Sequence, residues 1–180
     1  GKALVAITEP FILSDTSISS VTDLDITDDG TFYLSIWQQG VIQWHPQKHS
    51  AVLTLKDIHS NHGNQVLQLS AADDQHLFAA TRYSGLYTKV PNSGEWQPLP
   101  LATTNVVEGF SCVLPEQEIL WLCSEYGLWR YNRQFAELKQ YLPEQGLPSP
   151  YVNGAFFDHQ QRLWVLTNNG PARFDQQLQR

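Results

Sequence analysis

The stretch that decides the fold is residues 163–174, which read LWVLTNNGPARF. Four apolar residues lead into a Thr, a Gly follows after two Asn residues, and another short run starts directly after that Gly. Related stretches occur three more times in the chain, and the glycines at the equivalent place are Gly40, Gly85, Gly127 and Gly170. Successive glycines are 45, 42 and 43 residues apart. The chain therefore contains four copies of one structural unit.

Each unit divides into short strands joined by turns. In the first unit a strand ends at the Asp-Asp-Gly turn 28–30, and further strands are expected at 31–37, 41–45 and 51–55. Short runs rich in Val, Ile and aromatic residues, bounded by Gly, Asn and Asp, are typical of strands. The Gly that closes each hairpin supplies the positive φ that a tight turn needs. Four strands in about 40–50 residues is the period of a β-propeller blade.

The sequence therefore predicts one all-β propeller domain, or propeller segment, over residues 1–180, made of blades of four antiparallel strands. An additional outer strand is expected over residues 3–8, whose sequence resembles that of residues 51–55. The four repeats are expected at approximately 18–57, 64–101, 105–142 and 149–176.

The composition excludes several classes of protein. The 180 residues are 42% hydrophobic and 16% charged, which provides enough apolar material for a core. The net charge of -7 argues against nucleic-acid binding and against docking on an anionic membrane surface. No apolar run reaches the roughly 18–20 residues of a membrane helix. Because the chain contains no Met, we expect it to be a piece of a longer protein.

At the level of single residues, the fourth unit resembles the two-component regulator propeller repeat. The matching residues are Val152, Asp158, Leu163, Trp164, Thr167, Gly170, Arg173 and Phe174. Other units depart from the pattern, with Leu34 in place of the Trp, Pro115 in place of the turn Asp and Pro171 in place of a Leu. The resemblance covers about residues 15–176.

This resemblance implies a function. In that family such repeats form the extracytoplasmic sensor part of membrane-anchored bacterial signalling proteins, whose output is a histidine kinase or a diguanylate cyclase. It implies a non-enzymatic, periplasmic ligand-binding module that belongs to an inner-membrane protein. The remainder of such a signalling protein is then a partner of the propeller.

The number of blades leaves the closure of the ring open. Complete propellers of the family usually have seven blades or more, this chain has four repeats, and the fourth repeat stops after its third strand. Three alternatives follow: the four blades close into a ring alone, two chains pair as a homodimer, or the chain is part of a larger ring. Open seams expose strand edges and apolar faces, which proteins avoid.

Cysteine and histidine residues in the chain do not form a recognisable metal or catalytic motif. Cys112 and Cys123 flank one hairpin turn, where they either form a cross-strand disulfide or remain buried thiols. His59 and His62 share a loop, but further metal ligands are not evident, and no metal is expected. No phosphate-binding loop, nucleophile elbow or dinucleotide fingerprint is present, so no cofactor and no catalytic residue are expected.

Two carboxylates require a choice between roles. Asp23 and Asp25 lie on one face of an inner strand, because side chains alternate along a strand. Paired carboxylates can perform acid–base chemistry on a sugar. We favour a structural role in which they accept hydrogen bonds from neighbouring segments, because no second catalytic pattern accompanies them. The Asp residues in the turns are assigned to turn formation.

The topology predicts a candidate ligand-binding face. In a four-stranded blade, the turn between the second and third strands opens on the same side as the crossover into the next blade. Loops on this side suit carbohydrate, peptide or protein contacts, because they combine flat aromatic area with directional hydrogen bonds. We expect a small-molecule or glycan signal here; the alternatives are a propeller enzyme acting on polysaccharide and a protein-interaction scaffold. The candidate residues are Trp37, Arg82, Tyr83, Glu125, Tyr126, Asn153, Asn168 and Asn169.

Overall fold

A computed structural model describes residues 20–48, 50–55, 65–72, 75–90, 94–101 and 109–174. Within this part the chain forms four antiparallel sheets, and the strands of each follow one another in chain order. The first two sheets are β1 Val21–Ile26, β2 Phe32–Ile36, β3 Gly40–His45 and β4 Ser50–Leu55, then β5 Val66–Ala71, β6 Leu77–Thr81, β7 Leu86–Lys89 and β8 Trp96–Pro98. The last two are β9 Cys112–Glu116, β10 Ile119–Ser124, β11 Gly127–Asn132 and β12 Glu137–Tyr141, then β13 Val152–Phe157, β14 Leu163–Thr167 and β15 Gly170–Phe174.

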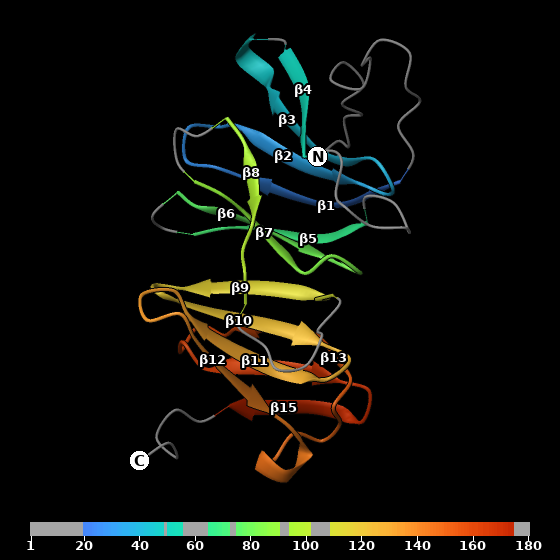
Figure 1. Cartoon of the computed structure of the whole chain (residues 1–180), viewed down its shortest axis with the longest axis vertical. Coiled ribbons are helices and arrows are strands. Elements are labelled where there is room, and N and C mark those ends of the chain that lie inside the picture. The colour runs from blue at the N-terminus through green and yellow to red at the C-terminus, as the bar shows by residue number, and fades with distance from the viewer. Residues whose placement is uncertain are drawn as a thin grey trace, which may run out of the picture.

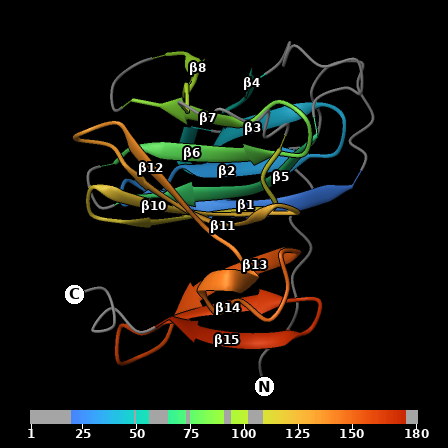
Figure 2. The ribbon, with the colours of Figure 1, turned by 60° about the horizontal axis from the view of Figure 1, so that its bottom comes forward.

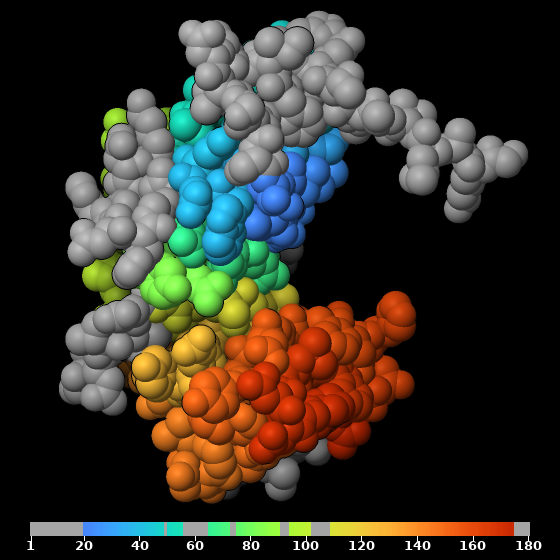
Figure 3. Space-filling view, turned by 90° about the vertical axis from the view of Figure 1, so that its right-hand side faces the viewer, coloured from blue at the N-terminus to red at the C-terminus, as the bar shows by residue number. Residues whose placement is uncertain are grey.

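The sheets follow one another along the long axis of the molecule (Figure 1). Their first strands lie on the inside, where β1 contacts β5, β5 contacts β9 and β9 contacts β13. The view in Figure 2 separates the fourth sheet from the other three, and the space-filling view in Figure 3 shows an arc that is hollowed on one side. The predicted all-β fold of antiparallel blades is confirmed. The outer strand expected over residues 3–8 lies outside the described residues.

The hairpin glycines adopt the conformation that the repeat requires. Gly40, Gly85, Gly127 and Gly170 have φ values of 113°, 72°, 110° and 109°. A side chain would strain this left-handed backbone, which explains why the turn ends on Gly in every unit.

Apolar side chains fill the space between successive sheets. Tyr33 of the first sheet packs with Leu69 of the second, and Phe78 of the second packs with Val113 of the third. Between the third and fourth sheets, the Trp121 and Phe174 ring centroids are 4.9 Å apart. The sheets are therefore held face to face by three separate cores, each shared by two repeats.

Side-chain oxygens of the inner strands reach the backbone of the next sheet. The Leu69 N–H donates to Asp23 Oδ2 at 2.8 Å, and the Ala71 N–H donates to Asp25 Oδ2 at 2.5 Å. One sheet later, Gln68 Oε1 accepts from the Val113 N–H at 2.8 Å. The structural role predicted for the two Asp residues is confirmed, since both carboxylates serve as struts between blades.

In the fourth repeat, the Asp of the turn between the first two strands accepts a hydrogen bond from a Trp indole. Asp158 accepts hydrogen bonds from Trp164 Nε1 at 2.8 Å and from Arg162 Nε at 2.7 Å. Partial desolvation, which raises the pKa of Asp158, is outweighed by these bonds, and the pKa falls well below its usual range. The prediction that Pro115 stands in place of this Asp in the third unit is wrong, because the strand register puts Glu116 at the place of Asp158. Glu116 Oε2 accepts from Trp121 Nε1 at 2.8 Å, so a carboxylate makes the same bond in both units.

The two cysteines face each other across β9 and β10. They form a disulfide with a Cα–Cα distance of 4.9 Å. Of the two alternatives left open by the sequence, the structure has the cross-strand bond, which is typical of proteins from oxidising compartments.

Removing one strut tests the structural role of the inner-strand carboxylates. The change Asp23→Ala leaves the Leu69 N–H without its acceptor, so we expect a loss of about 1–3 kcal/mol in the free energy of unfolding. Asp23→Asn keeps an acceptor oxygen and should lose less. Urea denaturation of the three proteins measures the difference, and equal stability of all three contradicts the assignment.

Acid should remove the contribution of Asp29. Hydrogen bonds from Thr27 and then Thr31 lower the pKa of Asp29 to about 2. Because the folded pKa lies below the unfolded value of about 3.9, the charged form stabilises the fold above that value and its contribution is lost as the pH falls toward 2. We expect Asp29→Asn to lower the Tm at neutral pH and the difference from wild type to shrink below about pH 4. Asp28→Asn, in the same turn, is the control, and a difference that grows with acid contradicts the argument.

Candidate functional site

A hollow of about 540 Å³ lies across the second, third and fourth sheets. It is placed on the side where the second and third strands of each sheet are joined. Its lining consists of Leu67, Arg82, Tyr83, Gly109, Phe110, Ser111, Ser124, Glu125, Tyr126, Tyr151, Val152, Asn153 and Asn168.

Three hairpin turns and two segments that lead into strands meet at this hollow. The turns are β6–β7, β10–β11 and β14–β15, and the two segments precede β9 and β13. Backbone bonds join them: the Phe110 N–H donates to Thr81 O at 2.8 Å, and the Gly127 N–H donates to Pro150 O at 2.7 Å. The topological rule used on the sequence therefore describes this side of the molecule, where hairpin turns and incoming segments lie together.

The structure brings six of the eight candidate residues to the hollow. These are Arg82, Tyr83, Glu125, Tyr126, Asn153 and Asn168. Trp37 lies in the β2–β3 turn of the first sheet, away from the lining, and Asn169 donates from Nδ2 to Pro148 O at 3.1 Å. Binding at these residues stays a prediction.

Sequence reasoning missed part of the lining. Tyr151 lies in the crossover 149–153 that leads into β13, which the topological rule assigns to this side, but it is not among the candidate residues. Phe110 and Ser111 were missed because they precede β9 without a hairpin signal of their own. The segments 59–64 and 103–105, which the topological rule also assigns to this side, lie outside the described residues, and His59 and His62 belong to the first of them.

Hydroxyl groups fix the turns that carry the exposed side chains. Thr81 Oγ1 donates to Gly85 O at 2.8 Å and accepts from the Ser84 N–H at 2.9 Å. Thr167 makes the same donation to Gly170 O at 2.6 Å. In the third sheet Ser124 replaces the Thr and accepts from the Tyr126 N–H at 3.0 Å. The Thr and Gly of the repeat pattern therefore form one unit, which holds the intervening residues in place.

The intervening residues present aromatic area and polar groups. Tyr83 is 38% exposed and Tyr126 is 60% exposed. The Arg82 guanidinium lies 5.4 Å from the Tyr83 ring centroid, and Asn153 Nδ2 donates to Asn168 Oδ1 at 2.8 Å. Flat rings beside oriented amide and guanidinium groups suit a polar ligand that also has an apolar surface.

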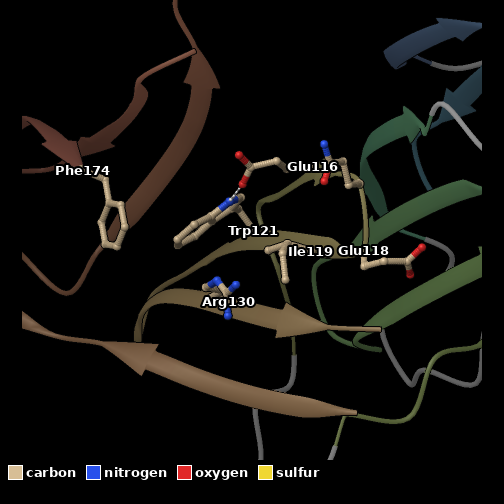
Figure 4. Close-up of a pocket in the computed structure, with 7 residues that line it drawn as sticks. Glu116, Glu118, Ile119, Trp121, Arg130 and Phe174 are labelled. Atoms are coloured by element: carbon tan, nitrogen blue, oxygen red, sulfur yellow. Dashed lines mark hydrogen bonds between the residues drawn. The ribbon is translucent and has the colours of Figure 1, made fainter. Parts of the chain in front are cut away.

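A second hollow, of about 590 Å³, lies between the third and fourth sheets on the opposite side (Figure 4). Glu116, Trp121, Arg130 and Phe174 line it, with Trp121 Nε1 bonded to Glu116. A smaller hollow of about 240 Å³ occupies the equivalent place between the first and second sheets. Because the same gap recurs between blades, we interpret it as a feature of the repeat.

Neither a metal centre nor a membrane helix occurs in the described ranges. There, no three His, Cys, Asp or Glu side chains gather closely enough to hold a metal ion. His45 is bonded within the first sheet, with Nδ1 2.9 Å from Thr31 Oγ1. The same ranges include no helix with the length and apolar character to cross a membrane.

Comparison with solved structures identifies the architecture. The extracellular domain of BT3049 from B. thetaiotaomicron, described as a hybrid two component system, is similar with a TM-score of 0.77 and 16% identity, over 97% of this chain and 25% of that one. The extracellular domain of BT4673 from the same organism, described as a one component system, is similar with a TM-score of 0.75 and 16% identity, over 95% of this chain and 22% of that one. YCF48 bound to D1 peptide is similar with a TM-score of 0.68 and 15% identity, over 88% of this chain and 51% of that one. The chain has the β-propeller fold.

The neighbours are of the kind that the repeat pattern indicates. The chain spans about a quarter or less of the length of the two B. thetaiotaomicron chains, with 25% and 22% covered. No family model matches the sequence. No curated protein matches it either. The likeness to these proteins is therefore one of fold.

The lining of the hollow depends on one glycine. A Cβ atom at Gly109 would lie 1.7 Å from Arg82 O, which is backbone of the β6–β7 turn. We expect Gly109→Ala to push the two segments apart and to lower the free energy of unfolding by about 1–3 kcal/mol. Gly94→Ala is the control, because a Cβ there meets nothing within 4 Å. Urea denaturation compares the two variants, and equal stabilities contradict the close approach.

Proposed function

We propose that this chain is the ligand-binding part of an extracytoplasmic sensor propeller in a bacterial transmembrane signalling protein, and that it is not an enzyme. The observation that carries the proposal is the hollow formed by three successive blades, in which Tyr83 and Tyr126 are exposed on turns held by hydroxyl bonds. Large aromatic side chains that stay exposed on a rigid support are common in binding sites.

The fold and the disulfide support the cellular setting. The structural neighbours from B. thetaiotaomicron are extracellular domains of signalling systems. A disulfide between Cys112 and Cys123 fits an oxidising compartment such as the periplasm. On this support we propose that the chain lies outside the cytoplasm, as part of an inner-membrane protein whose output domain is a histidine kinase or a diguanylate cyclase.

The ligand that we propose is a small-molecule or glycan signal. Tyrosine rings provide stacking area for a sugar face, and the amides of Asn153 and Asn168 provide directional hydrogen bonds to hydroxyl groups. An enzyme acting on polysaccharide is less well supported, since both inner-strand carboxylates, Asp23 and Asp25, bind backbone N–H groups.

A peptide-binding role is the second candidate. YCF48, which has a similar fold, is bound to a peptide in its solved structure. A peptide could use the same exposed rings, so the two ligand classes must be separated by experiment.

Substitution of the two exposed tyrosines tests the site. A thermal-shift screen of the 180-residue chain against neutral oligosaccharides and short peptides should give a higher Tm with a member of one class, because a ligand of the native state stabilises it. Tyr83→Ala and Tyr126→Ala should each weaken binding of that compound by more than about 1 kcal/mol while leaving the Tm of the free protein nearly unchanged.

Phe135→Ala is the matched control, because this exposed aromatic lies in the β11–β12 turn, at the end of the third sheet opposite to the β10–β11 turn. It should leave binding unaltered. If the Tyr variants unfold while binding per folded molecule is intact, the tyrosines belong to the core and the site is wrong. If a peptide alone raises the Tm, the interaction role replaces the glycan sensor.

A further inference from the structure

Among the described residues, the charged side chains that line the hollow occupy equivalent places on neighbouring hairpin turns. Arg82 directly follows Thr81 in the second sheet, and Glu125 directly follows Ser124 in the third. The hydroxyl groups of Thr81 and Ser124 hold these turns, and both charged side chains are exposed. At the same place in the fourth sheet stands Asn168, which is neutral. The hollow therefore presents a positive, a negative and a neutral polar group on three successive sheets.

The two opposite charges do not pair with each other. Within the described ranges, neither the Arg82 guanidinium nor the Glu125 carboxylate takes part in a salt bridge. The Arg82 guanidinium lies 5.4 Å from the centroid of the Tyr83 ring. A guanidinium has five N–H donors, so it can lie over a ring and still donate to a carboxylate. Both charges are therefore open to groups of opposite sign on a ligand.

Backbone contacts hold in place the turns that carry the two charges. The Arg82 N–H donates to Gln65 O at 2.9 Å, and Arg82 O lies close against Gly109. On the third sheet, Tyr126 O accepts from Gln140 Nε2 at 2.6 Å. Because the supports are fixed, binding a ligand orders the side chains alone, which lowers the entropic cost of binding.

The spacing of neighbouring sheets sets the size of a ligand that reaches both charges. Sheets that pack face to face lie about 10 Å apart, and the turns that carry Arg82 and Glu125 belong to adjacent sheets. A fully extended chain of two or three residues spans roughly 7–10 Å. The middle of a ligand of this length would lie beside Tyr83 and Tyr126, whose rings are 38% and 60% exposed.

We propose that the signal bound in the hollow is a zwitterion, a small molecule with a carboxylate at one end and an ammonium group at the other. The carboxylate accepts hydrogen bonds from the Arg82 guanidinium, and the ammonium group donates to the Glu125 carboxylate. A neutral sugar leaves both charges without a partner, and a simple anion or cation leaves one. The inference rests on the proposed sensor function, because it assigns the chemistry of the ligand in the same hollow.

Thermal-shift titrations of the full 180-residue chain test the two ends of the ligand separately. The probes are tripeptides of Gly, Ala and Ser with free ends, the same peptides acetylated, amidated or blocked at both ends, and muramic acid, an amino sugar with a carboxylate. We expect a free-ended compound to raise the Tm, because it binds the native state. Blocking one end should weaken its binding about tenfold, because one charge-assisted contact is lost. Binding of the tripeptides alone identifies a peptide as the zwitterion, and binding of muramic acid alone identifies an amino sugar acid.

Variants of the chain assign each end of the ligand to its residue. Arg82→Gln should weaken binding of the free-ended compound about tenfold and leave the affinity for its amidated form unchanged, because that form has no carboxylate. Glu125→Gln should act in the same way on the ammonium end and leave the affinity for the acetylated form unchanged. Glu137→Gln is the matched control, since Glu137 is exposed at the start of β12, after the β11–β12 turn, and should leave every affinity unaltered.

Circular dichroism spectra and Tm values of the free variants check that they fold. A doubly blocked peptide that binds as tightly as the free-ended one overturns the zwitterion, because it mimics an internal segment of a protein. Wild-type affinity in both Arg82→Gln and Glu125→Gln overturns it as well. If a neutral oligosaccharide raises the Tm and no free-ended compound does, the zwitterion fails while the sensor function stands. If no compound of either class raises the Tm, both proposals fail.

Discussion

The arrangement of the blades depends on hydrogen bonds from the backbone of one inner strand to side-chain oxygens of the strand before it. Asp23, Asp25 and Gln68 accept these bonds at the first two blade contacts. They fix the offset between neighbouring sheets, because a slip by one residue would remove the acceptor from its N–H group. At the third contact Cys112 occupies the position of Gln68 and is bonded to Cys123 within the third sheet, while packed aromatic rings join the third sheet to the fourth.

The same offset assembles the candidate site. Once neighbouring sheets are fixed, the turns β6–β7, β10–β11 and β14–β15 lie beside one another, and the hollow forms between them. The Thr or Ser that precedes each Gly then holds its turn internally. The hydroxyl groups thus hold the turn backbone, and the Tyr126 ring on one of these turns is 60% exposed.

Much of this was predictable from the spacing of glycines and apolar runs. The repeat period predicts the strands, and the order of the strands predicts the side on which Arg82, Tyr83 and Tyr126 lie. Both predictions succeed because they depend on local chain geometry. The parts that were missed depend on contacts between repeats. Trp37 was assigned to the site by its place in a turn, yet its blade does not border the hollow. Phe110 reaches the hollow through a backbone bond to Thr81, for which the sequence has no signal.

Departures from the repeat pattern keep the hydrogen bonds on which the blades depend. Glu116 replaces the turn Asp and still binds the indole of Trp121, and Ser124 replaces the Thr and still caps its turn. Each substitution keeps the hydrogen bond while changing the residue. A bond of this kind needs only a side chain that delivers an oxygen to the right place, so the fold does not require one particular residue at these positions. A search for this fold is therefore better directed at the positions of acceptors and positive-φ glycines than at residue identity.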